Sequence, residues 1–180
     1  ATPPVAPVPA KALWYFVGLQ VLLEHMPPTL AGVAIPTVLV LFLVALPYID
    51  HSRIHAGVWF STRRGKRVVM WTAVYTLIVM PALIALDNAF SLREALRGLA
   101  PSWIAQWFLP AIILAVIVLL PVLVLWRQKA NRREVMLALF TLMFVSAIIL
   151  TLSGFLFRGP GFQMYWPWQM PNGYNPWGEL

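Results

Sequence analysis

The residues best suited to chemistry lie within the first 26 positions, where aromatic and ionisable side chains are close in sequence. Trp14, Tyr15 and Phe16 are consecutive, and Glu24 and His25 follow a short apolar stretch. Aromatic walls suit a flat, lipophilic ligand whose orientation is fixed by a few polar groups. A carboxylate in apolar surroundings tends to a raised pKa and can accept a proton. Glu24 is therefore the candidate proton acceptor, and the competing interpretation is that it faces water from an amphipathic helix.

Metal chemistry has weaker support in the sequence. His51 and His55 are four residues apart, a spacing that places two ligands on one helical face, but Arg53 between them disfavours a bound cation. An exposed pair in a basic loop is the preferred interpretation. The chain has no cysteine, which excludes disulfides, iron–sulfur ligation and cysteine-linked haem within it. No metal site is predicted. For Arg158, which follows the last apolar run, the default partner is a lipid headgroup and the alternative is a carboxylate of a partner chain.

The composition is that of an integral membrane protein. Of the 180 residues, 61% are hydrophobic and 11% are charged, where a soluble domain carries about 25% charge. The mean hydropathy is +0.78, and the charges are confined to short clusters between long uncharged runs. The net charge is +7, and the basic residues that produce it lie beside apolar runs. Their placement therefore indicates a role in membrane topology and in contacts with anionic lipid headgroups, rather than nucleic-acid binding.

The pattern predicts an all-α integral membrane protein with four transmembrane helices, an N-terminal interfacial amphipathic helix and an aromatic C-terminal tail. We expect an extended Pro-rich arm at 1–10 and an interfacial helix at 11–28, which is too short to cross the bilayer. A four-helix membrane domain at 29–157 follows, with spans at about 29–49, 68–86, 103–126 and 135–157. A kink is expected near Pro36, and a Trp/Pro/Gly-rich tail occupies 158–180.

The basic residues set the expected orientation of the chain. Nine of the 13 lysines and arginines lie in the first and third loops between spans: Arg53, Arg63, Arg64, Lys66, Arg67, Arg127, Lys129, Arg132 and Arg133. Positively charged loops face the cytoplasm. The N-terminus, the interfacial helix and the C-terminal tail are therefore expected on the extracytoplasmic side, in the cytoplasmic membrane of a prokaryote.

Part of the chain, from Pro9 to about Leu86, resembles the C-terminal part of cytochrome b. The similarity is greatest to subunit IV of split cytochrome bf complexes and to related subunits of bacterial quinol–cytochrome c reductases. The matching residues are Trp14-Tyr15-Phe16 and Gln20, Gly32-Val33, Pro47-Tyr48-Ile49-Asp50, and Phe60, Arg63 and Arg64 in the following loop. The last two spans lie beyond the resemblance.

The resemblance implies a role in quinol oxidation. In that family the Trp-Tyr segment forms one wall of the outer quinol-oxidation pocket, and the protons leave on the outer side. The charge distribution independently places Trp14 and Tyr15 on that side. The Pro-Glu pair of the family motif is Ala12-Leu13 here. Lys11 or Glu24 would have to take the place of the missing carboxylate, or the proton leaves through another chain.

We therefore expect a haem-free subunit of a quinol:electron-acceptor oxidoreductase that is not an enzyme on its own, with Trp14, Tyr15 and Phe16 as the quinol-site wall. The implied partners are a haem-bearing cytochrome b N-terminal-type chain, an iron–sulfur protein, cytochrome c-type subunits, quinol and lipids. The b haems and the iron–sulfur cluster would reside in those partner chains. The alternative is a non-catalytic anchor or assembly subunit of a large membrane complex. A transporter is disfavoured because the predicted spans carry no charge.

Overall fold

The computed structural model describes residues 12–13, 15–49, 62–90, 107–159 and 164–169, and all structural statements below refer to these residues. The elements in chain order are α1 (Val17–His25), the π-helical turn η1 (Leu30–Ala34), α2 (Ile35–Ile49), α3 (Arg63–Phe90), α5 (Leu109–Arg127), α6 (Arg132–Leu156) and the 3₁₀ turn η4 (Pro167–Gln169).

The predicted fold class is confirmed: the chain is an all-α integral membrane protein with four helices long and apolar enough to span a bilayer. These are Leu30–Ile49, Arg63–Phe90, Leu109–Arg127 and Arg132–Leu156, with 20, 28, 19 and 25 residues. At 1.5 Å per residue each reaches or nearly reaches the ~30 Å of the hydrocarbon layer.

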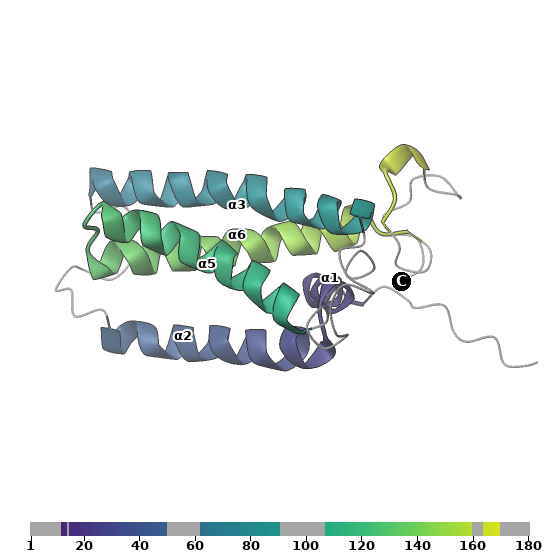
Figure 1. Ribbon diagram of the computed structural model, residues 1–180, viewed down its shortest axis with the longest axis horizontal. Coiled ribbons are helices and arrows are strands. Elements are labelled where there is room, and N and C mark those ends of the chain that lie inside the picture. The colour runs from purple at the N-terminus through teal and green to yellow at the C-terminus, as the bar shows by residue number, and fades with distance from the viewer. Residues whose placement is uncertain (1–11, 14, 50–61, 91–106, 160–163, 170–180) are drawn as a thin grey trace, which may run out of the picture.

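Three of the long helices form the body of the molecule, as Figure 1 shows, with α6 packed against both α3 and α5. The fourth, α2, runs along the opposite side of the bundle and contains no buried residue. The short helix α1 lies across one end, where it packs on α6. The molecule thus has an α1 end and an opposite end, where α3 begins and α5 passes into α6.

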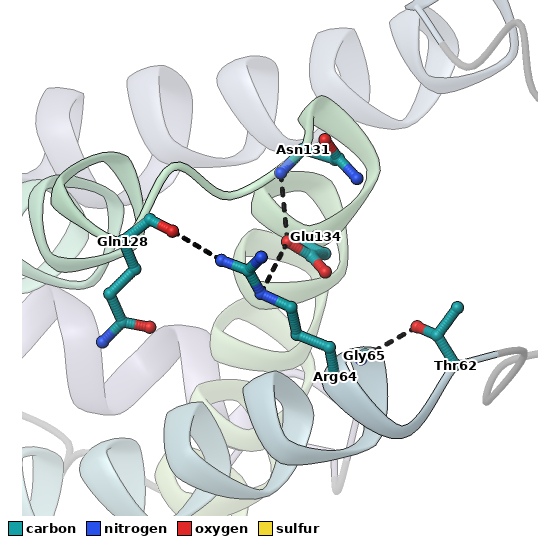
Figure 2. A network of polar contacts seen from close by, with 6 residues as sticks. All are labelled: Thr62, Arg64, Gly65, Gln128, Asn131 and Glu134. Carbon is teal, nitrogen blue, oxygen red and sulfur yellow. Dashed lines mark hydrogen bonds and ion pairs between the residues drawn. The ribbon is translucent and has the colours of Figure 1, made fainter.

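The opposite end is fixed by a polar network, shown in Figure 2. The Arg64 guanidinium donates to the backbone oxygen of Gln128 at 2.6 Å, and its Nε lies 3.4 Å from Glu134 Oε2. The same carboxylate oxygen accepts the Asn131 backbone N–H at 3.0 Å as part of a capping box that begins α6. One buried glutamate therefore both caps α6 and holds the start of α3 against the α5–α6 turn.

Helix α3 is longer than the predicted span 68–86 at both ends. At its start the backbone N–H of Gly65 donates to Thr62 Oγ1 at 3.0 Å, which satisfies an end group of the helix. At its end Asn88 Nδ2 donates to the Ile84 carbonyl at 2.7 Å, and Asp87 contacts His25 of α1. The first residues of the loop that was expected to begin at residue 87 are therefore helical: Asn88 bonds within α3, and Asp87 has a partner on α1.

The irregularity expected near Pro36 takes the form of the π-helical turn η1, directly before that residue. The backbone N–H of Ile35 donates to the carbonyl of Leu30, five residues earlier. Proline has no N–H to donate to the preceding turn, and a wider turn is one way for a helix to accommodate it.

Candidate functional site at the α1 end of the bundle

Helix α1 meets α6 through two glycines, one on each helix. A Cβ added to Gly18 would lie 3.0 Å from Thr151 Oγ1, and one added to Gly154 would collide with Val17 and lie 2.8 Å from Val21 Cγ2. The side chains of Val17 and Val21 are consequently 1% and 0% exposed. The sequence predicted an interfacial helix at 11–28. The observed helix covers only Val17–His25, and one face of it is packed against α6.

An ion pair closes this contact beside the helix crossing. Arg158 Nη1 lies 2.7 Å from Glu24 Oε2, and the Arg158 side chain is 0% exposed. The chain folds back just beyond α6, where the Tyr165 backbone N–H donates to the Phe157 carbonyl at 2.8 Å and Arg158 forms an isolated bridge with Met164. The predicted lipid-headgroup contact of Arg158 is therefore wrong, because its guanidinium is enclosed within the protein.

The charge of the buried guanidinium is balanced locally. Burial lowers the pKa of Arg158, while the neighbouring carboxylates of Glu24 and Asp87 act in the opposite direction. An arginine remains protonated in proteins. The carboxylate of Glu24 is thus committed, at least in part, to a fixed positive charge, while its side chain remains 36% exposed.

A second pair joins α1 to α3. His25 Nδ1 lies 3.2 Å from Asp87 Oδ2, and the two side chains are 15% and 25% exposed. A carboxylate in this position fixes the orientation of an imidazole. The α1 end thus brings together two acids and two bases from three segments far apart in the sequence.

A largely apolar cavity of about 630 Å³ opens beside this cluster. Its walls come from α2, α3, α5 and α6, and include Ile35, Leu39, Phe42, Met80, Ile113, Leu114, Leu142 and Met143. Tyr15, His25 and Asp87 also line it. The cavity therefore offers apolar walls together with one tyrosine and one His–Asp pair.

The predicted site residues are distributed unevenly around this cavity. Tyr15 lines it and is 54% exposed, and the ring of Phe16 stands 4.8 Å away, centroid to centroid, at an interplanar angle of 54°. Glu24 belongs to the ion pair with Arg158 and does not line the cavity. Trp14 lies outside the described residues, as do His51 and His55. Within the described part of the chain, no group of three or more His, Cys, Asp or Glu residues is placed to hold a metal ion.

Asp87 was missed at the sequence level, and His25 and Arg158 were not predicted to interact within the chain. Asp87 is 62 residues from His25, and Arg158 is 134 residues from Glu24, so no local spacing links them. One feature of the sequence could have indicated that these residues have partners. Each of the three adjoins a long apolar run, and a charged group in such a position needs a partner.

The fold and this end cluster define a multi-pass membrane protein whose polar groups gather at the ends of apolar helices. Comparison with protein families matches residues 1–89 to the family described as Cytochrome b(C-terminal)/b6/petD. Residues 1–89 are thus similar to that family, in agreement with the sequence motifs. The match supports a membrane subunit of a bc- or b6f-type complex, and it ends at α3, so α5 and α6 lie beyond it. No curated protein and no solved structure matches the chain.

Proposed function

We propose that this chain is a haem-free membrane subunit of a quinol:electron-acceptor oxidoreductase, and that its α1 end forms part of the outer quinol-oxidation site. The observation that carries the proposal is the position of Tyr15. This residue belongs to the motif shared with the cytochrome b family, and it lines an apolar cavity that also contains the His25–Asp87 pair. Trp14 and Phe16 complete the proposed wall.

The cavity suits a quinol in size and chemistry. Ligand pockets of about 300–1,000 Å³ with mostly apolar walls and a few placed polar groups are typical for small lipophilic ligands. The volume of about 630 Å³ lies within that range. The contribution of this chain is to hold the quinol ring in a water-poor position from which electrons can leave to partner chains.

The charge distribution supports a position of the proposed site on the outer side of the membrane. At the end opposite α1, the described chain carries Arg63, Arg64, Lys66, Arg67, Arg127, Lys129, Arg132 and Arg133. A basic end faces the cytoplasm, so α1 and the residues after α6 belong on the extracytoplasmic side, in the cytoplasmic membrane of a prokaryote. Protons released from a quinol at that end would leave outwards.

The electron carriers belong in partner chains. The only histidine among the described residues is His25, which is engaged with Asp87, so these residues do not fit a pair of axial haem ligands. Helix α2 presents side chains such as Val38, Leu41 and Val44, each about 60% exposed. We propose that a haem-bearing cytochrome b chain covers part of this surface, with an iron–sulfur protein and a cytochrome c-type subunit completing the complex.

Replacing Tyr15 with Ala tests the proposal. We expect quinol oxidation by the purified complex to slow about ten-fold or more, because the quinol loses one wall of its pocket, while the haem spectrum of the complex is unchanged. Tyr48→Ala is the matched control, since Tyr48 is an exposed tyrosine that does not line the cavity. Equal turnover in the Tyr15→Ala and wild-type complexes would rule out the proposed wall.

The non-catalytic anchor is the second candidate, and the absence of any buried residue in α2 favours it. A helix with this little internal packing depends on lipid or on another chain for its environment. The anchor role predicts that α2 substitutions impair assembly, whereas Tyr15→Ala leaves turnover per assembled complex unchanged.

A further inference from the structure

We infer that the cavity beside Tyr15 holds the isoprenoid tail of the quinol, so that the tail lies inside this chain rather than in the surrounding lipid. The inference rests on the proposed function, which uses only the end of the cavity at Tyr15, and it names the substrate class as a long-tailed quinol. It also assigns a role to α5 and α6, which lie beyond the family match and supply much of the cavity wall.

The cavity is long compared with a single quinol ring. Its wall on α6 extends from Thr151, which lies beside Gly18 of α1, to Leu139, twelve positions earlier in the same helix. At 1.5 Å per residue this is about 18 Å, more than half of the ~30 Å hydrocarbon layer. On α5, which slants across the bundle from the α1 end in Figure 1, the wall extends from Leu109 to Val118. A ring against Tyr15 therefore fills only one end of the cavity.

The cavity is also narrow, which excludes a helix of a partner chain as its occupant. A volume of about 630 Å³ spread over about 18 Å of length gives a mean cross-section of about 35 Å². An α-helix with its side chains is about 10–12 Å across and needs about 80 Å² or more. A single hydrocarbon chain is the kind of occupant that these dimensions admit.

The polarity of the lining distinguishes a quinol from a phospholipid. Tyr15, His25 and Asp87 line the α1 end. The far end is formed by apolar side chains from α2, α5 and α6: Phe42, Val118, Leu139 and Met143. No lysine or arginine occurs among the described lining residues, so a phosphate at the α1 end would meet the carboxylate of Asp87 without such a cation to pair with it. The uncharged ring of a quinol carries no such penalty.

A bound tail would position the ring. Binding energy from a part of the substrate that does not react can orient the part that does, and truncated substrates then lose kcat. Since lipid is as apolar as the cavity wall, the tail gains from close packing rather than from leaving water. The shape of the wall formed by α5 and α6 thus determines how strongly a tailed quinol is preferred over a tail-free one.

The kinetic test compares a farnesyl-tailed benzoquinol with tail-free tetramethylbenzoquinol in the complex purified with its native partners. The measured quantity is the ratio of the two kcat/KM values, tailed over tail-free. We expect Val118→Trp to lower this ratio by about ten-fold, because the larger side chain overpacks the far end of the cavity. Val116→Trp is the matched control: Val116 is on the same helix, is 53% exposed and does not line the cavity, so the ratio should stay at its wild-type value.

Photo-labelling of the wild-type complex provides a second measurement that does not depend on the assembly of a variant. A benzoquinone with a diazirine at the end of a farnesyl tail is bound and illuminated. We expect label in α5 or α6, and we expect excess natural quinol to suppress it. Label confined to partner chains would overturn the inference. Label in α5 or α6 that natural quinol does not suppress would also overturn it, because the cavity would then belong to a lipid acyl chain.

The failure of this inference is distinguishable from the failure of the proposed function. The inference is overturned if Tyr15→Ala slows the oxidation of both quinols while Val118→Trp keeps the wild-type ratio. If Tyr15→Ala leaves both rates unchanged, the proposed function itself fails. Haem content per complex identifies a Val118→Trp complex that does not assemble, and the labelling of the wild-type complex then decides the question.

Discussion

Arg158 shows at the residue scale how an apolar chain uses its few charges. Its guanidinium is fully enclosed, yet the chain supplies the carboxylate of Glu24 at 2.7 Å from a helix that lies 134 residues earlier. A buried charge is costly unless it is paired and hydrogen-bonded. This pair therefore links the α1 segment to the end of α6. Removing one partner should lower the stability of the folded protein more than removing a surface charge does.

Glu24→Gln tests this role. We expect the variant complex to lose about 2 kcal/mol of stability, because a buried guanidinium is left without its counter-ion. Thermal inactivation of the complex in detergent provides the measurement. Arg127→Gln is the matched control, since Arg127 is exposed at the opposite end and its loss should change stability by less than about 0.5 kcal/mol. Equal loss in both variants would contradict the structural role of the Glu24–Arg158 pair.

At the scale of elements, the position of α1 depends on the absence of side chains at the helix crossing. Gly154 admits Val17 and Val21 to van der Waals contact, and Gly18 brings α1 close to Thr151. Small residues allow helix backbones to approach closely in membranes, where packing rather than hydrophobicity drives association. The orientation of Tyr15 and His25 towards the cavity follows from this crossing.

Gly154→Ala should displace α1. The added methyl group collides with Val17 and Val21, which belong to the packed face of α1, so the helix must shift. We expect turnover to fall at least as far as in Tyr15→Ala, with α3, α5 and α6 intact by circular dichroism. Gly32→Ala is the control: the nearest side-chain atom is 3.9 Å from the added Cβ, and turnover should be unchanged. Wild-type turnover in Gly154→Ala would show that the close crossing is not required.

The four long helices were predictable because each is an apolar run long enough to span a bilayer, and that signal is local. The packing of α1 against α6 was not predictable from the sequence. The segment before Pro27 is apolar on several sides, and its sequence does not show which side meets another helix. The extension of α3 through Asp87 depends likewise on His25, a partner from another element. The motif singled out Tyr15 as a candidate, but its place beside the cavity and the His–Asp pair both required the tertiary structure.

At the scale of the whole molecule, the chain is a bundle with chemically different ends. One end gathers arginines and lysines around the Arg64–Glu134 network (Figure 2), and the other carries α1 (Figure 1), the Glu24–Arg158 pair and the cavity. This polarity supports a single orientation in the membrane, with the α1 end outside.

The absence of cysteine from the sequence makes this orientation easy to test. We expect Trp168→Cys to react with a membrane-impermeant maleimide added to intact cells, and Lys129→Cys to react only after the membrane is opened. Both original side chains are exposed, at opposite ends of the bundle. The reverse labelling pattern would place the cavity on the cytoplasmic side and would remove the proposed outer site.

The central claim is that a quinol binds against Tyr15, and photo-crosslinking tests it most directly. An azido-quinone is bound to the purified complex, illuminated, and the labelled peptides are identified by mass spectrometry. We expect label in the peptide that contains Tyr15, and we expect excess natural quinol to suppress it. Label confined to other chains, or label at Tyr15 that natural quinol does not suppress, would contradict it.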